Sequence, residues 1–298
     1  MANRPLLTAG AAVVGAGAGL LGYALWEAQA YGVRHEVVPV LPPGSDDVRV
    51  LHLSDIHLMP NDLKRTAWLR SLVDLQPDLV VSTGDNISHR DSVPVLLDAL
   101  EPLLELPGMF VFGSNDYYEP VFKNPLAYLR RGGTPSRHAG WLPWQDLHDG
   151  FVAAGWTDLN NRRDQVKVGS LLIDVVGVDD PHILRDRYDD VAGPAAPEAG
   201  LSLGVVHAPY RRVLDAMALD ERALILAGHT HGGQVCLPGY GALVTNCDLD
   251  RARAKGLSRY GDDDESWLHV SAGIGTSPYA PIRLACRPEA IVLTLTAR

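Results

Sequence analysis

Short runs of apolar residues recur from residue 48 onward, and each of the first three ends in polar residues. These three runs cover residues 48–54, 78–83 and 108–112. Apolar runs of this length indicate strands buried on both faces, as in a sheet that is covered by helices. Residues 62–75 and 93–105, which lie between the runs, repeat apolar positions with helical spacing and predict two covering helices. The first third of the chain therefore predicts alternating strands and helices.

Five later apolar runs have the same character and predict further strands. They cover residues 171–178, 201–206, 224–227, 267–271 and 290–295. We interpret residues 37–43, which include Pro39, Pro42 and Pro43, as a connecting stretch before the first strand. Because no internal repeat or interdomain linker interrupts the pattern, we expect a single α/β domain over residues 31–298.

Residues 117–150 break this rhythm. The segment is rich in aromatic residues and contains Arg130 and Arg131, which are followed by two glycines. Because it follows directly on a strand that ends in polar residues, we expect a cap or lid insertion. Arg130 and Arg131 would then bind the substrate. The alternative is a packed excursion that does not contact the substrate.

The first 30 residues have a different pattern. No charged residue occurs between Leu6 and Trp26, and a helix of that length rises roughly 30 Å, the thickness of a bilayer core. We expect a single N-terminal membrane anchor. The alternatives are a cleaved signal peptide, since residues 28–30 resemble a cleavage site, and a helix that lies on the domain. Arg4 before the apolar run favours a cytoplasmic N-terminus and an extracytoplasmic catalytic domain.

Composition and the absence of certain motifs exclude several classes of function. The chain has 36 acidic and 26 basic residues, a net charge of −10, so it lacks the basic surface that nucleic acids require. Its three cysteines have no paired spacing and predict neither a disulfide framework nor a zinc ribbon; we interpret them as small buried hydrophobes. No Gly-x-Ser-x-Gly motif indicates a serine nucleophile. Positive charge for phosphate chemistry must then come from metal ions or a few arginines.

Seven polar side chains at the predicted strand ends are candidate metal ligands. They are Asp55, His57, Asp85, Asn115, His207, His229 and His231. Since α/β sheets bind ligands at the carboxyl ends of their strands, we expect these residues at one edge. Oxygen donors with imidazoles and without thiolate suit Mn, Zn or Fe. A carboxylate shared by two such ions holds them roughly 4 Å apart, where they activate a bridging water and clamp a phosphoryl group.

The order of these motifs resembles the calcineurin-like metallophosphoesterase superfamily. The motifs are Asp55-x-His57, Gly84-Asp85, Gly113-x-Asn115, His207 and Gly228-His229-Thr230-His231. The resemblance covers residues 48–298 and implies a four-layer α/β/β/α sandwich of two mixed sheets flanked by helices. It also implies two divalent metal ions. The first would be held by Asp55, His57, Asp85 and His231, and the second by Asp85, Asn115, His207 and His229.

The C-terminal tail resembles one branch of this superfamily more than the others. Residues 271–277, 281–283 and 288–289 are similar to the membrane-associated branch that includes UDP-2,3-diacylglucosamine pyrophosphatases and exported phosphodiesterases. This implies hydrolysis of a phosphodiester or pyrophosphate, with a membrane lipid or nucleotide-linked lipid as the favoured substrate and Arg283 as a binding residue. One alternative is a general phosphodiesterase or phosphatase that acts on soluble nucleotides, including cyclic ones.

One position departs from the family pattern. The family reads Gly-Asn-His followed by Asp or Glu, whereas this chain reads Gly113-Ser114-Asn115-Asp116. We interpret Asn115 as the family ligand and Asp116 as the replacement of a histidine that protonates or stabilises the leaving oxygen. Asp116, with Asn115 and His207, is then a catalytic candidate, and it can donate a proton only if its pKa is raised.

Other consequences of this departure stay open. The leaving group can already be good, such as the phosphate of a pyrophosphate. Another side chain can also replace the histidine; the candidates are His89, His138, His182 and Arg283. A further alternative is a metal-binding protein with weak catalysis.

Overall fold

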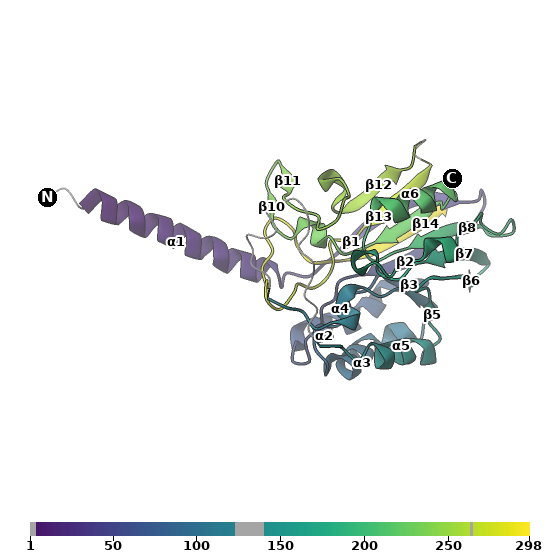
Figure 1. Ribbon diagram of the computed structural model, residues 1–298, viewed down its shortest axis with the longest axis horizontal. Coiled ribbons are helices and arrows are strands. Elements are labelled where there is room, and N and C mark those ends of the chain that lie inside the picture. The colour runs from purple at the N-terminus through teal and green to yellow at the C-terminus, as the bar shows by residue number, and fades with distance from the viewer. Residues whose placement is uncertain (1–3, 123–139, 263–264) are drawn as a thin grey trace.

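Two β-sheets packed face to face form the centre of the protein, with helices on both outer faces (Figure 1). The computed structural model describes residues 4–122, 140–262 and 265–298. Helix α1 (Arg4–Glu27) projects from one end of the domain (Figure 1). The arrangement confirms the predicted four-layer α/β/β/α sandwich.

Each sheet has six strands. The order in the first sheet is β1 (Gly32–Leu41), β14 (Glu289–Ala297), β2 (Val48–Leu53), β3 (Leu79–Ser82), β4 (Gly108–Phe110) and β5 (Thr157–Asp158). The order in the second sheet is β12 (Gly256–Tyr260), β13 (Ser266–Val270), β9 (Leu224–Ala227), β8 (Leu201–Val205), β7 (Leu171–Gly177) and β6 (Arg162–Val168). The pairs β14–β2, β12–β13 and β6–β7 are antiparallel and the other neighbours are parallel, so both sheets are mixed.

Helices cover the two sheets unequally. The first sheet packs against α2 (Leu63–Ser71), α3 (Ser92–Leu104) and α5 (Trp144–Ala153), and the second against α6 (Arg211–Leu219). Among the described residues, the short elements are α4 (Ser114–Tyr117), a β-hairpin of β10 (Cys236–Leu237) and β11 (Gly241–Ala242), and five 3₁₀ turns. These turns are η1 (Leu72–Leu75), η3 (Pro181–Ile183), η4 (Tyr188–Asp190), η5 (His231–Gly233) and η6 (Arg251–Arg253).

Alternation of side chains explains the continuous apolar runs in the central strands. In β9, Leu224 and Leu226 pack between the two sheets, whereas Ile225 packs against α6. In β2, Val50 lies between the sheets and Leu51 contacts the helical layer. Because successive residues of a strand point to opposite faces and both faces are covered, both sets of positions are apolar.

Strand β1 corrects one expectation from the sequence. Residues 37–43 were expected to be a connection, but residues up to Leu41 belong to a strand that pairs with β14 in parallel. Val38 and Val40 are buried while Val37 and Pro39 are exposed. Proline is tolerated here because β1 is an edge strand, where a missing N–H removes no hydrogen bond to a second neighbour.

Helix α1 is attached to the domain near its C-terminal end. The backbone N–H of Arg283 donates to Ala24 O, and the Glu27 carboxylate accepts the N–H groups of Ala285 and Cys286. The side chains of Leu20 and Leu21 are exposed. Within the described residues, none of the helices combines the length and the apolar character needed to cross a lipid bilayer.

The segment expected to form a lid lies partly outside the described residues. Residues 123–139, including Arg130, Arg131 and His138, belong to the part that the structure does not describe. Residues 144–150 form the beginning of α5, where Leu147 packs into the core. The lid therefore stays a prediction for the remainder of residues 117–150.

Candidate metal centre

The strand ends of both sheets meet at one edge. Asp55 and His57 follow β2, Asp85 follows β3, and Asn115 lies in α4 directly after β4. His207 follows β8, and His229 and His231 follow β9. The structure thus brings together all seven candidate ligands, through the contacts given next.

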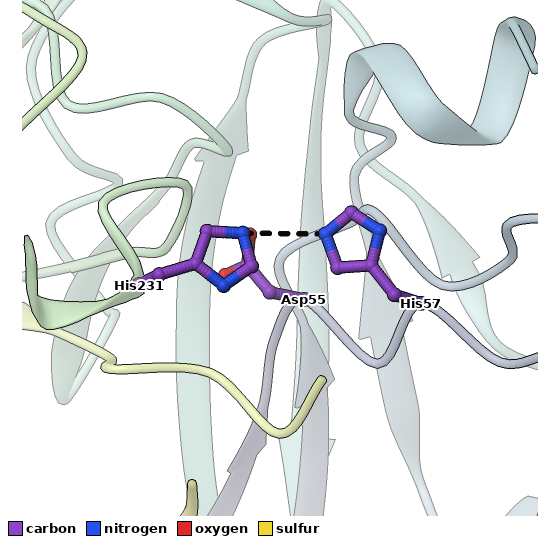
Figure 2. A group of neighbouring side chains, drawn as sticks. All are labelled: Asp55, His57 and His231. Atoms are coloured by element: carbon purple, nitrogen blue, oxygen red, sulfur yellow. Dashed lines mark hydrogen bonds and ion pairs between the residues drawn. The ribbon is translucent and has the colours of Figure 1, made fainter. Parts of the chain in front are cut away.

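Three side chains form the first group of the centre. Figure 2 shows Asp55, His57 and His231 pointing toward one another. The Nε2 atoms of His57 and His231 lie 3.3 Å apart, and Asp55 Oδ1 lies 3.5 Å from His231 Nε2. Their ligand atoms all lie within 4.8 Å of one another, which allows one ion to contact all three.

Asp85 connects this group to the second one. Its Oδ2 lies 3.5 Å from His57 Nε2, and its Oδ1 lies 3.5 Å from His207 Nε2. His207 Nε2 is in turn 3.3 Å from His229 Nδ1. Asn115 orients the shared carboxylate, because its backbone N–H and its side-chain amide donate to the two oxygens of Asp85 at 2.8 and 2.7 Å. Ligand atoms of Asp55, Asp85 and His207 also cluster within 4.8 Å, so Asp55 reaches both groups.

The outward nitrogen of each histidine has a partner that fixes the ring. His207 Nδ1 lies 2.7 Å from Thr83 O, His231 Nδ1 lies 3.2 Å from Gly275 O, and His229 Nε2 lies 3.3 Å from Asn246 O. His57 Nδ1 lies 3.0 Å from Ser88 Oγ. A carbonyl oxygen can only accept, so the neutral rings of His229 and His231 donate outward and leave the lone pair of the inner nitrogen free. The inner nitrogen of His207 has a free lone pair once that ring is neutral.

One buried oxygen lacks a protein partner. Asp55 is fully buried, and its Oδ1 has no hydrogen bond within the described part of the chain. Such an atom is costly in a folded protein. Because it faces His231 Nε2 within a set of oxygen and imidazole donors, the residues fit a divalent cation of the Mn, Zn or Fe type.

Backbone conformation sets these residues apart. Asp55, His57, Asp85, His229 and His231 all have positive φ angles, between 46° and 67°. Non-glycine residues rarely adopt this region, at a cost of about 1–3 kcal/mol each, and such residues concentrate at functional sites. The sharp turns that these angles produce direct the side chains of the five residues inward from the strand ends.

Two glycines allow the ligand loops to pack closely. A Cβ atom at Gly113 would collide with Asp85 Oδ1, and one at Gly228 would collide with Ser54 Oγ. Ser54 Oγ itself donates to Asp55 Oδ2 at 2.5 Å. Glycine is therefore required at both positions by contact with the ligand carboxylates.

Electrostatics divide the histidines into two classes. Burial lowers the pKa of His57 to about 4 and that of His231 to about 3, so both rings are neutral, the form that binds metal. Burial also lowers the pKa of His207, but Asp85, Asp180 and Asp55 outweigh it and raise that pKa to about 9. His207 must therefore lose a proton when a cation binds.

Asp116 holds two ligand loops together. Its fully buried carboxylate accepts the backbone N–H groups of Asp85, Asn86 and Gly113 at 2.7–2.9 Å. Burial, followed by Asp85, raises the pKa of Asp116 to about 7, the direction that a proton donor requires. Both oxygens are nevertheless occupied by the loops, and action of Asp116 on the leaving group stays a prediction.

This contact also corrects the alignment of the departing motif. Without a shift, the family sequence Gly-Asn-His-Asp/Glu places its last carboxylate at Asp116 and its histidine at Asn115. A carboxylate that ties Gly113 to Asp85 fits the last position better than the histidine position. Ser114 then stands at the position of the family asparagine, and Asn115, a neutral amide, at that of the histidine. Asn115 is nevertheless the amide that reaches Asp85 and stays the candidate ligand.

Arg283 lies behind the centre. Its guanidinium is fully buried and donates to the carbonyls of Gly275 at 2.7 Å, Gly273 at 3.1 Å and His231 at 3.4 Å. Its donors brace the loop of His231, and substrate binding by Arg283 stays a prediction. The side chain of His89 is exposed beside Asp91.

Two further residues lie close to the candidate ligands: His182, one of the candidates to replace the family histidine, and Asp180, which was not among the candidate site residues. The partly exposed His182 ring lies 4.5 Å from that of His229, centre to centre, and its Nδ1 lies 3.1 Å from Tyr210 Oη. Asp180, fully buried, accepts the His182 N–H through Oδ1, while its Oδ2 has no partner among the described residues. The signal was present, since Asp180 follows the strand at residues 171–178.

Comparison with known proteins agrees with this chemistry. A family model described as calcineurin-like phosphoesterase matches residues 48–233. The metallophosphoesterase YkoQ of Bacillus subtilis is 27% identical over 252 residues, 83% of each chain. Phosphodiesterase YaeI of Escherichia coli is 28% identical over 254 residues, 83% of this chain and 82% of that protein. A transmembrane protein with a metallophosphoesterase domain from Bos taurus is 29% identical over 316 residues, 100% of this chain and 63% of that protein.

Proposed function

Because the chain belongs to the calcineurin-like phosphoesterase family and is a metal-dependent phosphoesterase, we propose that it binds two divalent ions and hydrolyses a phosphodiester or pyrophosphate bond. The observation that carries this proposal is Asp85, whose two oxygens face His57 on one side and His207 on the other. A carboxylate in this position suits a pair of ions. The name of the relative YaeI supports a phosphodiester.

The chain would supply both the ligands and their orientation. Asp55, His57, Asp85 and His231 would hold one ion, and Asp85, Asn115, His207 and His229 the other. Such ions act as Lewis acids and lower the pKa of a water that attacks phosphorus. Thr83 O and Gly275 O keep the imidazoles turned inward, so little reorganisation is needed during the reaction.

His182 is the side chain we propose in place of the family histidine. It lies beside His229 and is partly exposed, whereas the fully buried Arg283 guanidinium donates to loop carbonyls and lies 3.4 Å from His231 Nδ1, and the His89 side chain lies beside Asp91. Its ring is positioned by Tyr210 and its backbone by Asp180. His182 would donate a hydrogen bond to the phosphoryl group or to the leaving oxygen.

The substrate we favour is a phosphoester or pyrophosphate of a membrane lipid or nucleotide-linked lipid. Support comes from α1, whose residues Leu20, Leu21, Leu25 and Trp26 are exposed near the domain. The bovine relative, named as a transmembrane protein, aligns with the whole of this chain. We propose that α1 attaches the domain to a membrane, with the catalytic domain on the extracytoplasmic side.

Metal analysis and a substrate panel test the catalytic proposal. The purified protein should contain two ions per chain and hydrolyse bis-p-nitrophenyl phosphate. A chelator should abolish turnover, and Mn²⁺ or Zn²⁺ should restore it. The same preparation is then offered lipid phosphoesters, nucleotide pyrophosphates and cyclic nucleotides. Preference for soluble nucleotides would refute the lipid substrate, and metal binding without turnover on any member would refute hydrolysis.

Vesicle flotation tests attachment. The full chain should float with phosphatidylglycerol vesicles, and replacing Leu20 and Leu21 by Asn should weaken flotation severalfold. Leu219→Asn, at the exposed last residue of α6, is the matched control and should have no effect. Equal flotation of all three proteins would contradict attachment through α1. Protease treatment of intact cells then tests the side of the membrane, because only an extracytoplasmic domain is cleaved.

A further inference from the structure

Two cysteines that are 50 residues apart in the sequence meet behind His231. Cys236 Sγ lies 3.2 Å from Gly232 O, and Cys286 Sγ lies 3.5 Å from the same oxygen. Cys286 Sγ also lies 3.2 Å from His231 O. The two thiols are hydrogen-bond partners of each other. A pair of thiols therefore contacts the backbone of a candidate metal ligand.

The surroundings of the pair favour thiol chemistry. Lys255 Nζ lies 3.8 Å and an Arg283 nitrogen 3.9 Å from Cys286 Sγ. Both cysteines are packed with Ala242, Ala254 and Ala272, whose small side chains restrict the sulfur atoms little.

Only a thin layer of chain covers the thiols. Cys236 is 5% and Cys286 1% exposed. Cys236 begins β10, a strand of two residues, and the next residue, Leu237, is 46% exposed. The β10–β11 hairpin lies at the rim of the domain (Figure 1). Since a two-residue pairing opens easily, a small oxidant can reach the pair without global unfolding.

We propose that Cys236 and Cys286 form a reversible disulfide when the protein meets hydrogen peroxide. The sulfur of one cysteine attacks a peroxide oxygen and the O–O bond breaks. The departing hydroxide takes up the proton of that thiol and leaves as water, so that the cysteine becomes a sulfenic acid. The second thiol displaces the hydroxyl of the sulfenic acid as a second water, and the S–S bond forms. Two thiols are oxidised and one peroxide is reduced to two waters.

The disulfide would act on the loop of His231. Sulfur atoms at a bond length of about 2 Å draw β10 toward residue 286. The thiols can then no longer donate to His231 O and Gly232 O, which both lie in η5. Because contacts around a ligand typically change metal affinity by about 10–100-fold, we expect oxidation to weaken metal binding about tenfold. This consequence rests on the proposed metal centre, whereas disulfide formation does not.

Mass spectrometry of the metal-loaded full chain tests the disulfide. After peroxide treatment, the intact mass should decrease by two hydrogen atoms, and titratable thiols in denaturant should fall from three to one. Peptide mapping should link residues 236 and 286, and dithiothreitol should reverse both changes. Cys236→Ser and Cys286→Ser should each prevent the link, while Cys247→Ser is the control and should form it normally.

The outcomes separate this inference from the proposed function. An unchanged number of thiols, a link through Cys247, or sulfinic acid without a link would overturn the disulfide, and no substrate is needed to observe them. Competition with a metal chelator then measures affinity before and after oxidation. A disulfide that leaves affinity unchanged in the wild type would overturn the connection to His231 alone.

Discussion

The two sheets contribute different chemistry to one centre. The first sheet supplies oxygen ligands, and these are oriented by donors: Asn115 donates to Asp85, and Ser54 donates to Asp55. The second sheet supplies only imidazoles, and these are oriented by carbonyl acceptors, as His207 is by Thr83. His57 is the one imidazole that follows a strand of the first sheet.

The difference shows that neither half is complete alone. The acceptor for His207 belongs to the first sheet, and the backbone N–H of His229, from the second sheet, donates to Asp55 Oδ2 at 2.9 Å. Each sheet therefore finishes the orientation of the other sheet's ligands. A precise metal centre forms only when the sheets pack.

Removing the shared carboxylate should have the largest effect. Asp85→Ala deletes a ligand of both ions, so we expect elemental analysis to show loss of metal. Several kcal/mol of transition-state stabilisation should disappear with it, and at about 1.4 kcal/mol per factor of ten kcat/KM should fall about a thousandfold or more. Asp91→Ala, which removes an exposed carboxylate six residues after Asp85 in the sequence, should retain wild-type activity. A variant at Asp85 with both ions bound would refute the shared role.

The prediction for the second sheet concerns the proton that His207 releases when metal binds. The pKa of His207 is raised to about 9, so near pH 7.5 the metal-free protein holds a proton there that metal binding must release. His207→Gln should release about one proton fewer and bind metal about a hundredfold more weakly. Calorimetry of metal binding in buffers of different ionisation enthalpy measures both quantities. Equal proton release by the two proteins would contradict the assignment.

The same pKa sets the sign of a stability change. Because the folded pKa of His207 lies above the ordinary histidine pKa of 6.5, its contribution to the stability of metal-free protein is complete below about pH 6.5. It is lost as the pH rises through about 9. The difference in melting temperature between wild type and His207→Gln should shrink over this interval, as thermal denaturation at several pH values would show.

Removing the Asp116 carboxylate, which joins two ligand loops of the first sheet, should have an intermediate effect. Asp116→Ala leaves three backbone N–H groups without their acceptor, so we expect metal affinity to fall about 10–100-fold. Asp116→Asn keeps one acceptor oxygen and should lose less. Both losses should be the same for aryl phosphodiesters with good and poor leaving groups. A loss that grows as the leaving group becomes poorer would support Asp116 as the proton donor.

The smallest effect should come from the partner of His57. Ser88→Ala removes the oxygen that lies 3.0 Å from His57 Nδ1 while leaving the ligand itself. We expect metal affinity to fall about tenfold, as chelator competition would measure. Ser71→Ala, on the exposed surface, is the control. If Ser88→Ala had no effect, backbone geometry alone would suffice to orient His57.

Much of the centre was predictable because strand ends are visible in the sequence. The buried runs before Asp55, Asp85 and His207 mark where parallel strands end, and the ligand types are typical of a divalent cation. The edge strand β1 was missed because Pro39 within it, and Pro42 and Pro43 after it, are typical of a connection. Asp180 was missed although it follows a strand, since the sequence does not show which strand-end carboxylates stay buried.

Other features depend on contacts between distant segments. Asp116 and Arg283 are chemically suited to catalysis and substrate binding, but the structure directs Asp116 to backbone N–H groups and Arg283 to carbonyls. Cys236 and Cys286 lack any informative spacing, yet they converge on one oxygen. In each case the partner, rather than the residue type, decides what the side chain does.

The sequence by itself determined the buried strands, their ends and the kinds of ligand, because side-chain periodicity and residue chemistry are local properties. The four layers followed from the family resemblance. Only the tertiary structure decided which groups share Asp85, which nitrogen of each histidine faces inward, and which charged residues are structural. Those outcomes require segments as far apart as 124 residues for His207 and Thr83, or 174 for His229 and Asp55, to be in contact. Such contacts follow from the packing of two sheets, which local sequence patterns do not encode.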